Sequence, residues 1–266
     1  MCQALNVSRS GYYAFLKRPL SKRAMRRKAL LETIKKIFEK NHKIYGAPRI
    51  TRALPEEQKA CVGTVAKLMR ENGIRPKTVK KYKATTNSRH SLPVAENILN
   101  RDFTATKRNE KWVSDITYIW TEEGWLYLAA LLDLYDNSVV GWSMDSRMKT
   151  ELVSSALKNA ILRTRAGEGL IVHSDRGVQY ASKEYQKLLT KNRFVCSMSR
   201  KGNCYDNAPM ESFWGKLKTE WLYGKRFKTR EQAKQAVFEY IELYYNRQRL
   251  HSGNGYIPPL KLKDIV

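Results

Sequence analysis

The eleven residues "LIVHSDRGVQY", Leu170 to Tyr180, join a short apolar run to a charged turn. The run Leu170–Val172 is typical of a buried strand, and Asp175–Gly177 is typical of the turn that ends it. A surface turn is the simplest interpretation. An aspartate at the end of a buried strand is also placed to bind a ligand at the edge of a sheet. The question is therefore which other side chains meet Asp175.

Strand-like and helical segments surround this stretch. Runs rich in β-branched and aromatic residues predict strands, and apolar residues at three- and four-residue steps predict helices. In chain order the strands are 111–120, 125–135, 138–144, 170–173 and 194–198, and the helices between the last three are 150–165 and 182–191. Short connections between the first three strands predict an antiparallel meander. The whole order predicts one mixed sheet flanked by helices, an α/β domain.

Asp115 interrupts the apolar and aromatic segment "KWVSDITYIW", where an unpaired buried carboxylate is costly. If the first and fourth strands are neighbours in the sheet, Asp115 and Asp175 converge. Carboxylates that converge in this way are suited to divalent cations, and a pair of cations needs further oxygen ligands. The sequence therefore predicts a third acid near these two.

The candidate for the third acid is Glu211 in "NCYDNAPMESFWGKLKTEW". Asp206 or Asn207 can cap a helix here, and a proline suits its first turn. Lys218 lies seven residues after Glu211, which is two helical turns, so the two side chains share a face.

Other interpretations of the three acids stay open. Asp115 can pair with a buried arginine, Asp175 can pair with its neighbour Arg176, and Glu211 can face solvent. With 17 acids in residues 111–266, some triple with plausible spacing is expected by chance.

The net charge of the 266 residues is +25, and it is distributed unevenly. Residues 1–110 carry 26 basic and 8 acidic side chains, whereas residues 111–266 carry 24 and 17. Such an excess of positive charge favours a polyanionic partner, most commonly nucleic acid. A basic protein that binds no nucleic acid specifically, or one associated with ribosomes, is the alternative.

The N-terminal part has a helical pattern from Ser21 to about Arg75. A short helix, a turn and a second amphipathic helix closed by Asn72–Gly73 suggest a helix-turn-helix, with Lys67 and Arg70 on the second helix as DNA contacts. Many small helical hairpins share this pattern, so an ordinary hairpin is the alternative. The first residues, "LNVSRSGYYAF", are compatible with the end of another such unit.

These patterns predict four regions. They are a helical, helix-turn-helix-like DNA-binding region over residues 1–75, a basic linker over 76–110, a catalytic α/β domain over 111–246 and a C-terminal tail over 247–266. No apolar run is long enough to span a membrane, and no signal peptide is evident. The four cysteines form no C-x-x-C pair, which disfavours a zinc site or disulfides and fits a reducing cytoplasm.

The segments "WVSDITYI", "HSDRGVQY" and "SRKGNCYDNAPMESFWGKLKTE" resemble those of the DDE transposases of bacterial insertion sequences, specifically the insertion-sequence-three family. The 35 residues between Asp175 and Glu211 match the interval typical of that family. "YYNRQRLH" at Tyr244–His251 and "IYGAPRI" at Ile44–Ile50 are also similar. The segment "HSGNGYIPP" departs from the family pattern, which leaves the packing of the turn around Asn254 in question.

The resemblance implies a fold similar to retroviral integrase and ribonuclease H, with a mixed five-stranded sheet. It implies a polynucleotidyl transferase that cleaves DNA at the element ends and joins them to target DNA. Asp115, Asp175 and Glu211 would be the catalytic ligands of two Mg²⁺ ions, for which Mn²⁺ substitutes, and Lys218 would contact a terminal phosphate. The expected partners are double-stranded DNA at terminal inverted repeats and at the target, and further copies of the chain on that DNA.

The resemblance further implies a bacterial, cytoplasmic, nucleoid-associated protein. Relatives are often made as a fusion with an upstream reading frame that carries a leucine zipper. No heptad zipper occurs in this sequence, so we expect it to be the downstream-frame product, which needs the upstream part for some functions. Two other functions stay open: a ribonuclease H-like, metal-dependent nuclease without strand transfer, and a domesticated DNA-binding protein. The three intact acids argue against the latter.

Overall fold

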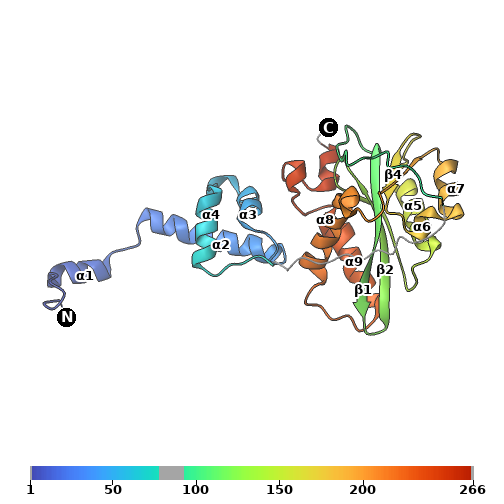
Figure 1. The fold of residues 1–266 in the computed structure, drawn as a ribbon. Helices are drawn as coiled ribbons and strands as arrows, with labels where there is room; N and C mark the ends of the chain where they lie inside the picture. The colour runs from blue at the N-terminus through green and yellow to red at the C-terminus, as the bar shows by residue number, and fades with distance from the viewer. Residues whose placement is uncertain (1, 78–92, 265–266) are drawn as a thin grey trace. The chain divides into compact units, whose positions relative to one another are not determined.

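The computed structural model describes residues 2–77 and 93–264. It divides into two compact units, Met1–Lys77 and Thr78–Val266 (Figure 1). The first is helical, and the second is a mixed sheet flanked by helices, so the predicted fold class is confirmed. No helix within the described ranges is both long and apolar enough to cross a membrane.

The first unit is built on three helices that bury a common apolar core. Its elements are α1 (Arg9–Lys17), α2 (Lys22–Lys40), α3 (Ala47–Ala53) and α4 (Val62–Glu71). The core side chains are Leu30, Ile34, Phe38, Ile50, Val65, Leu68 and Met69. Helix α4 ends at Asn72, and Gly73 follows with a φ of 66°, as the sequence predicted. Helix α1 buries none of its side chains.

The second unit contains the predicted five-stranded sheet. Its strands are β1 (Lys111–Thr121), β2 (Gly124–Asp133), β3 (Val139–Asp145), β4 (Ile171–Ser174) and β5 (Val195–Met198). They lie in the order β3-β2-β1-β4-β5, with an antiparallel meander of the first three, as predicted, and parallel pairing of β1 with β4 and of β4 with β5. The first and fourth strands are therefore neighbours, which is the condition for Asp115 and Asp175 to converge.

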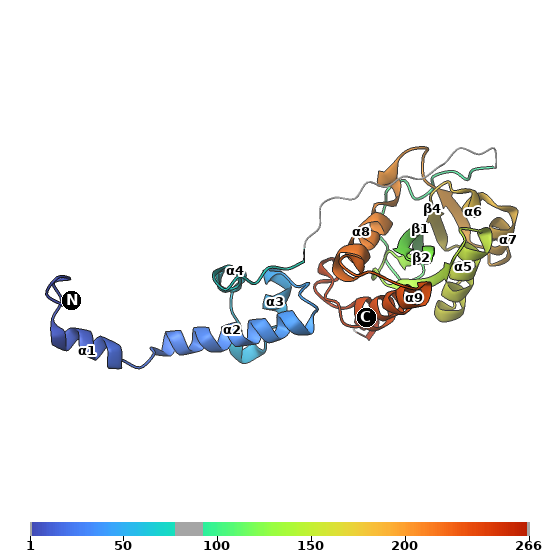
Figure 2. The ribbon, with the colours of Figure 1, turned by 90° about the horizontal axis from the view of Figure 1, so that it is seen from below.

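Helices cover both faces of this sheet (Figures 1 and 2). Helices α5 (Thr150–Thr164), α6 (Val178–Ala181) and α7 (Lys183–Lys191) lie on one face, and α8 (Ala208–Leu217) and α9 (Arg230–Phe238) lie on the other. Helix α8 continues as a π-helical turn, Lys218–Leu222, and α9 continues as a longer one, Glu239–Tyr245. The sequence pattern predicted α5, α7 and α8 but neither α9 nor the π-helical turns.

Residues 93–110 pack on the second unit, although the sequence analysis placed them in the basic linker. Leu99 is buried, and its backbone N–H donates to the hydroxyl of Ser197 on β5. Asn97 donates to Asp206, which lies just before α8. The composition of this stretch resembles a linker because its contacts are made by a few scattered side chains. Residues 78–92 of the predicted linker lie outside the described residues.

Residues 247–264 also pack on the second unit, whereas the sequence analysis expected a tail. Arg249 is buried and pairs with Glu220. The amide of Asn254, in the segment that departs from the family pattern, donates to the carbonyl of Asp136 at 2.5 Å. Isolated anchors of this kind leave no periodic signal in the sequence.

Gly141 sets the distance between β3 and α5. A Cβ atom at this position would lie 2.4 Å from the carbonyl oxygen of Ala156 and 2.6 Å from the backbone nitrogen of Ala160. Both atoms belong to the backbone of α5, so the helix cannot yield by a side-chain rotation.

We expect Gly141→Ala to destabilise the second unit by about 2–4 kcal/mol, because α5 must move away from β3 to make room for the new methyl group. All six tryptophans lie between Trp112 and Trp221, so urea unfolding followed by tryptophan fluorescence reports this unit. Gly215→Ala in α8, where a Cβ meets nothing within 4 Å, is the matched control and should add stability. Equal midpoints for the two variants would contradict the close approach of β3 and α5.

Candidate functional site

The parallel pairing of β1 with β4 places two carboxylates side by side. Val113 pairs with His173, and continuing this register by two residues aligns Asp115 with Asp175. Asp115 lies within β1, and Asp175 follows the last residue of β4. The sequence therefore brings these two acids together through backbone register alone.

Asp115 is partly buried and electrostatically strained. Burial and the neighbouring Asp175 raise its pKa to about 7, with a smaller contribution from Glu211, while hydrogen bonds from the backbone of Ile116 and from Trp214 lower it. The indole N–H of Trp214 donates to Asp115 Oδ2 at 2.9 Å. Trp214 thus holds the carboxylate in place from α8, a role that the sequence analysis missed.

Asp175 is held by the turn that follows β4. Its Oδ1 accepts the backbone N–H of Gly177 at 2.9 Å, and a Cβ at Gly177 would lie 3.0 Å from the same oxygen. Arg176 donates through Nε to the carbonyl of Ser199 at 2.6 Å, which ties this turn to the loop that leads to α8.

Glu211 lies on the first turn of α8 and is exposed. The amide of Asn207 donates to the carbonyl of Ser114 at 3.0 Å, so the start of α8 is fixed beside Asp115. Partial burial raises the pKa of Glu211. Among the described side chains, no group of three potential metal ligands is close enough together to hold an ion as it stands. Asp115, Asp175 and Glu211 therefore do not form a closed set of ligands in this structure.

Lys218 begins the π-helical turn that follows α8 and lies near Asp115. Its Nζ is 5.1 Å from the centroid of the Tyr118 ring. Partial burial lowers the pKa of Lys218, and the nearby Asp115 opposes this shift. An ammonium group therefore lies within electrostatic reach of Asp115.

Two buried hydrogen-bond systems near the site were not predicted. His173, two residues before Asp175, bonds through its ring nitrogens to Ser197 Oγ at 2.8 Å and Ser199 Oγ at 3.1 Å, and burial lowers its pKa to about 4. Asp206, expected as a possible helix cap, instead accepts from the guanidinium of Arg200, which is the main cause of its strongly lowered pKa. Neither system leaves a pattern in the sequence, because the burial of a single polar side chain is not readable there.

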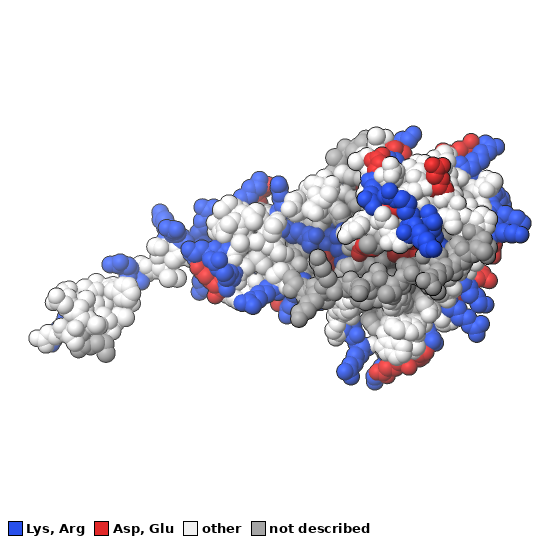
Figure 3. All heavy atoms as spheres, in the orientation of Figure 1, with Lys and Arg blue, Asp and Glu red and all other residues white. Residues whose placement is uncertain are grey.

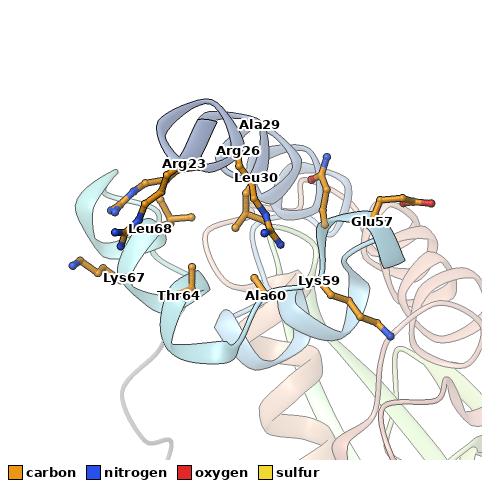
Figure 4. Close-up of a pocket in the computed structure, with 12 residues that line it drawn as sticks. Arg23, Arg26, Ala29, Leu30, Glu57, Lys59, Ala60, Thr64, Lys67 and Leu68 are labelled. Carbon is orange, nitrogen blue, oxygen red and sulfur yellow. The ribbon is translucent and has the colours of Figure 1, made fainter. Parts of the chain in front are cut away.

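Lys67 and Arg70 are exposed on α4 in the first unit. Lys67 lines a hollow of about 490 Å³ between α2, the segment before α4, and α4 (Figure 4). Four further basic residues line the same hollow: Arg23, Arg26, Arg27 and Lys59. Its lining also includes the apolar Leu30 and Leu68.

We expect Asp115→Asn to stabilise the metal-free protein at pH 8 by about 1–3 kcal/mol. The folded-state pKa of Asp115 lies above the unfolded value, so the wild type loses unfolding free energy as pH rises from about 4 to 7. The neutral amide avoids this loss, and the difference between the two proteins should vanish near pH 4.

The measurement is tryptophan-monitored urea unfolding in EDTA at both pH values. Glu168→Gln removes an exposed carboxylate and serves as the control. A difference that is the same at pH 4 and pH 8 would show that Asp115 carries no raised pKa.

Family models match both units. Models of the integrase core domain match residues 105–204 and 211–264, and a model of an HTH-like domain matches residues 25–82. Asp115 and Asp175 lie in the first match, Glu211 and Lys218 in the second, and Lys67 in the third.

Full-length relatives are similar along nearly the whole chain. A 31 kDa protein of insertion element IS600 from Shigella sonnei is 46% identical over 266 residues, covering 99% of this chain and 97% of the relative. The transposase InsF for insertion sequence IS3A from Escherichia coli K12 is 43% identical over 262 residues, covering 97% of this chain and 91% of the relative.

A solved structure supports the fold. A chain of the simian T-cell lymphotropic virus intasome, determined in complex with PP2A regulatory subunit B56 gamma, gives a TM-score of 0.51 at 18% identity. The match covers 86% of this chain and 73% of that chain.

Proposed function

Because this chain belongs to the insertion-sequence-three family of transposases, we propose that Asp115, Asp175 and Glu211 are its catalytic carboxylates. The protein is an enzyme of DNA transposition with an integrase catalytic core. The observation that carries the proposal is the β1–β4 register, which aligns Asp115 with Asp175. Burial, together with this neighbouring carboxylate, raises the pKa of Asp115 to about 7.

The two aspartates fit a divalent cation. Like charges held this close are unfavourable unless a proton or a cation lies between them, and oxygen ligands are those that Mg²⁺ prefers. Asp115 and Asp175 would hold the ions, and Glu211 would complete the set after a change of rotamer. We propose two Mg²⁺ ions, replaceable by Mn²⁺, which supply charge for activating the attacking oxygen and stabilising the leaving one.

The side chains of the site have separable roles in this proposal. Trp214 and the backbone N–H of Gly177 orient the two aspartates, each through one hydrogen bond at 2.9 Å. Lys218 contacts a non-bridging phosphate oxygen at the element end as a point charge. The attacking group is first water and then a DNA 3′-hydroxyl, and no covalent bond to the protein forms.

The first unit binds DNA in this proposal, with Lys67 and Arg70 on α4 as contacts. Lys and Arg side chains are prominent on its visible surface (Figure 3). The basic hollow places Arg23 and Arg26 of α2 across from Lys67, which suits a phosphate backbone passing over the hollow. We propose terminal inverted repeats as the DNA bound here, target DNA as the second substrate, a homo-oligomer on the DNA, and dependence on an upstream-frame product.

A nuclease that only hydrolyses DNA would use the same carboxylates. Strand transfer separates the two functions, because it needs the 3′-hydroxyl of one DNA molecule to attack another. Joined products of element-end duplex and target plasmid are therefore the discriminating observation.

We expect Asp115→Asn, Asp175→Asn and Glu211→Gln each to reduce Mg²⁺-dependent cleavage and strand transfer by about 10³-fold or more, because each removes a ligand charge while keeping the shape. The assay uses a labelled element-end duplex and the full chain. Binding of the duplex should persist in all three variants. Glu184→Gln, an exposed carboxylate at the start of α7, is the control. Near-normal cleavage by any of the three would remove that residue from the site.

We expect Lys67→Ala with Arg70→Ala to weaken duplex binding and to reduce its dependence on salt. The slope of the logarithm of the binding constant against the logarithm of salt concentration should fall by about one for each phosphate that is no longer neutralised. Fluorescence anisotropy of the full chain at several salt concentrations measures both quantities. Lys35→Ala on α2, where the lysine is exposed and pairs with Glu32, is the control. An unchanged slope in the double variant would exclude α4 from the DNA-contacting surface.

A further inference from the structure

Three aromatic rings form a ladder at the end of the β1–β2 hairpin. Trp120 and Trp125 are cross-strand partners, and their ring centroids are 4.8 Å apart at an interplanar angle of 73°. Tyr118 lies two residues before Trp120 on the same face of β1, and its ring is 5.1 Å from that of Trp125. The ladder therefore runs in the order Tyr118, Trp125, Trp120.

The outer part of this ladder is exposed. The side chain of Trp120 is 59% exposed and that of Trp125 is 43% exposed. Trp112, on the same face of β1, is fully buried in the core instead. Two adjacent tryptophans held in fixed geometry and left open to solvent form a contiguous apolar patch, and such patches mark interaction sites.

The ladder begins beside the carboxylate site. Lys218 lies over the Tyr118 ring and within electrostatic reach of Asp115. The pairing of β1 with β4 ends at Val113, and β4 itself ends at Ser174, so within the described sheet the β4-facing edge of β1 from Asp115 onward has no strand beside it. Asp115 and Tyr118 project from opposite faces of β1, and Lys218 reaches the Tyr118 ring at this open edge. A DNA strand that leaves the site and passes around the edge would meet Lys218 and then the rings.

Charges of both signs surround the hairpin. The loop after β3 carries exposed Arg147 and Lys149, and Gln179 of α6 donates to the carbonyl of Met148 in that loop. The hairpin tip carries exposed Glu122 and Glu123, and the guanidinium of Arg230 donates there to the backbone carbonyls of Glu123 and Trp125. Positive side chains therefore lie at both ends of the ladder, Lys218 beside Tyr118 and Arg230 beside Trp125.

We propose that Tyr118, Trp125 and Trp120 form a stacking platform for unpaired bases of the DNA strand whose phosphate lies at the Asp115–Asp175 site. The inference rests on the proposed function of that site and adds a recognition element to it. Every base has a face that stacks on an aromatic ring, so such a platform binds unpaired nucleotides with little sequence preference. A second copy of the chain fits less well, because three rings between charged rims are far smaller than the roughly 800 Å² per partner of a stable interface.

The test uses the full chain with Trp120→Ala and Trp125→Ala, singly and together, and Trp120→Phe as the conservative variant. The probes are an element-end duplex with two unpaired nucleotides next to the cleavage point, carrying 2-aminopurine there, and the fully paired duplex. Phe238→Ala, which removes an aromatic ring that is 46% exposed on α9, is the matched control. Circular dichroism checks that each variant is folded.

We expect the double variant to bind the unpaired probe about tenfold or more weakly and to leave its 2-aminopurine bright, because the bases no longer stack on the rings. Binding of the paired duplex should change less, and Trp120→Phe should restore quenching. Unchanged affinity and quenching in the double variant would overturn the platform. A loss of self-association by sedimentation, with quenching unchanged, would also overturn it and assign the rings to contacts between copies.

The same probes separate failure of the platform from failure of the proposed site. Asp115→Asn should lose cleavage yet still quench the unpaired probe, because the rings are untouched. If Asp115→Asn cleaves normally while the tryptophan variants lose quenching, the rings bind bases but the carboxylate assignment is wrong. If it fails to cleave while the tryptophan variants quench normally, the site stands and the platform is wrong.

Discussion

The parallel register between β1 and β4 is the constraint on which the rest of the second unit depends. It is set by backbone hydrogen bonds, yet it places Asp115 beside Asp175. Burial and this neighbouring carboxylate raise the pKa of Asp115 to about 7. A structure that keeps two carboxylates in this arrangement loses stability near neutral pH in the absence of a cation. Burial of apolar side chains in the surrounding core, where α5 and α7 pack on the sheet, offsets that loss.

The helix that carries Glu211 is anchored at both ends by charge pairs. Before it, Arg200 and Arg101 both donate to the buried carboxylate of Asp206. After it, Glu220 accepts two hydrogen bonds from the buried guanidinium of Arg249 and one from the hydroxyl of Tyr240. Removing one partner of the buried Glu220–Arg249 pair costs about 3–5 kcal/mol, because the other charge stays buried. The exposed side chain of Glu211 therefore lies on a helix that is fixed at both ends.

Local patterns in the sequence were sufficient for the five strands, the antiparallel meander and most helices, because periodicity and short connections determine them. The pairing of β1 with β4 was only a condition in the sequence analysis, and the convergence of Asp115 with Asp175 depended on it. They did not reveal the docking of residues 93–110, where Leu99 and Asn97 act as single anchors, or the packing of Arg249 and Asn254. They also missed the indole of Trp214 as the partner of Asp115. Each of these contacts joins residues far apart in the chain through one side chain, and such pairings have no repeat that a pattern can detect. The exposure of Glu211 was one of the interpretations that the sequence left open.

The two π-helical turns, Lys218–Leu222 and Glu239–Tyr245, face each other through Glu220 and Tyr240. A π-helical turn holds more residues per turn than an α-helical one, so the direction of every later side chain depends on it. Loss of a single residue between Leu217 and Leu222 would turn Glu220 by about 100° relative to α8 and separate it from Arg249. Related chains should therefore tolerate substitutions in this stretch better than insertions or deletions. Insertions and deletions should fall instead in the loop between the first π-helical turn and α9.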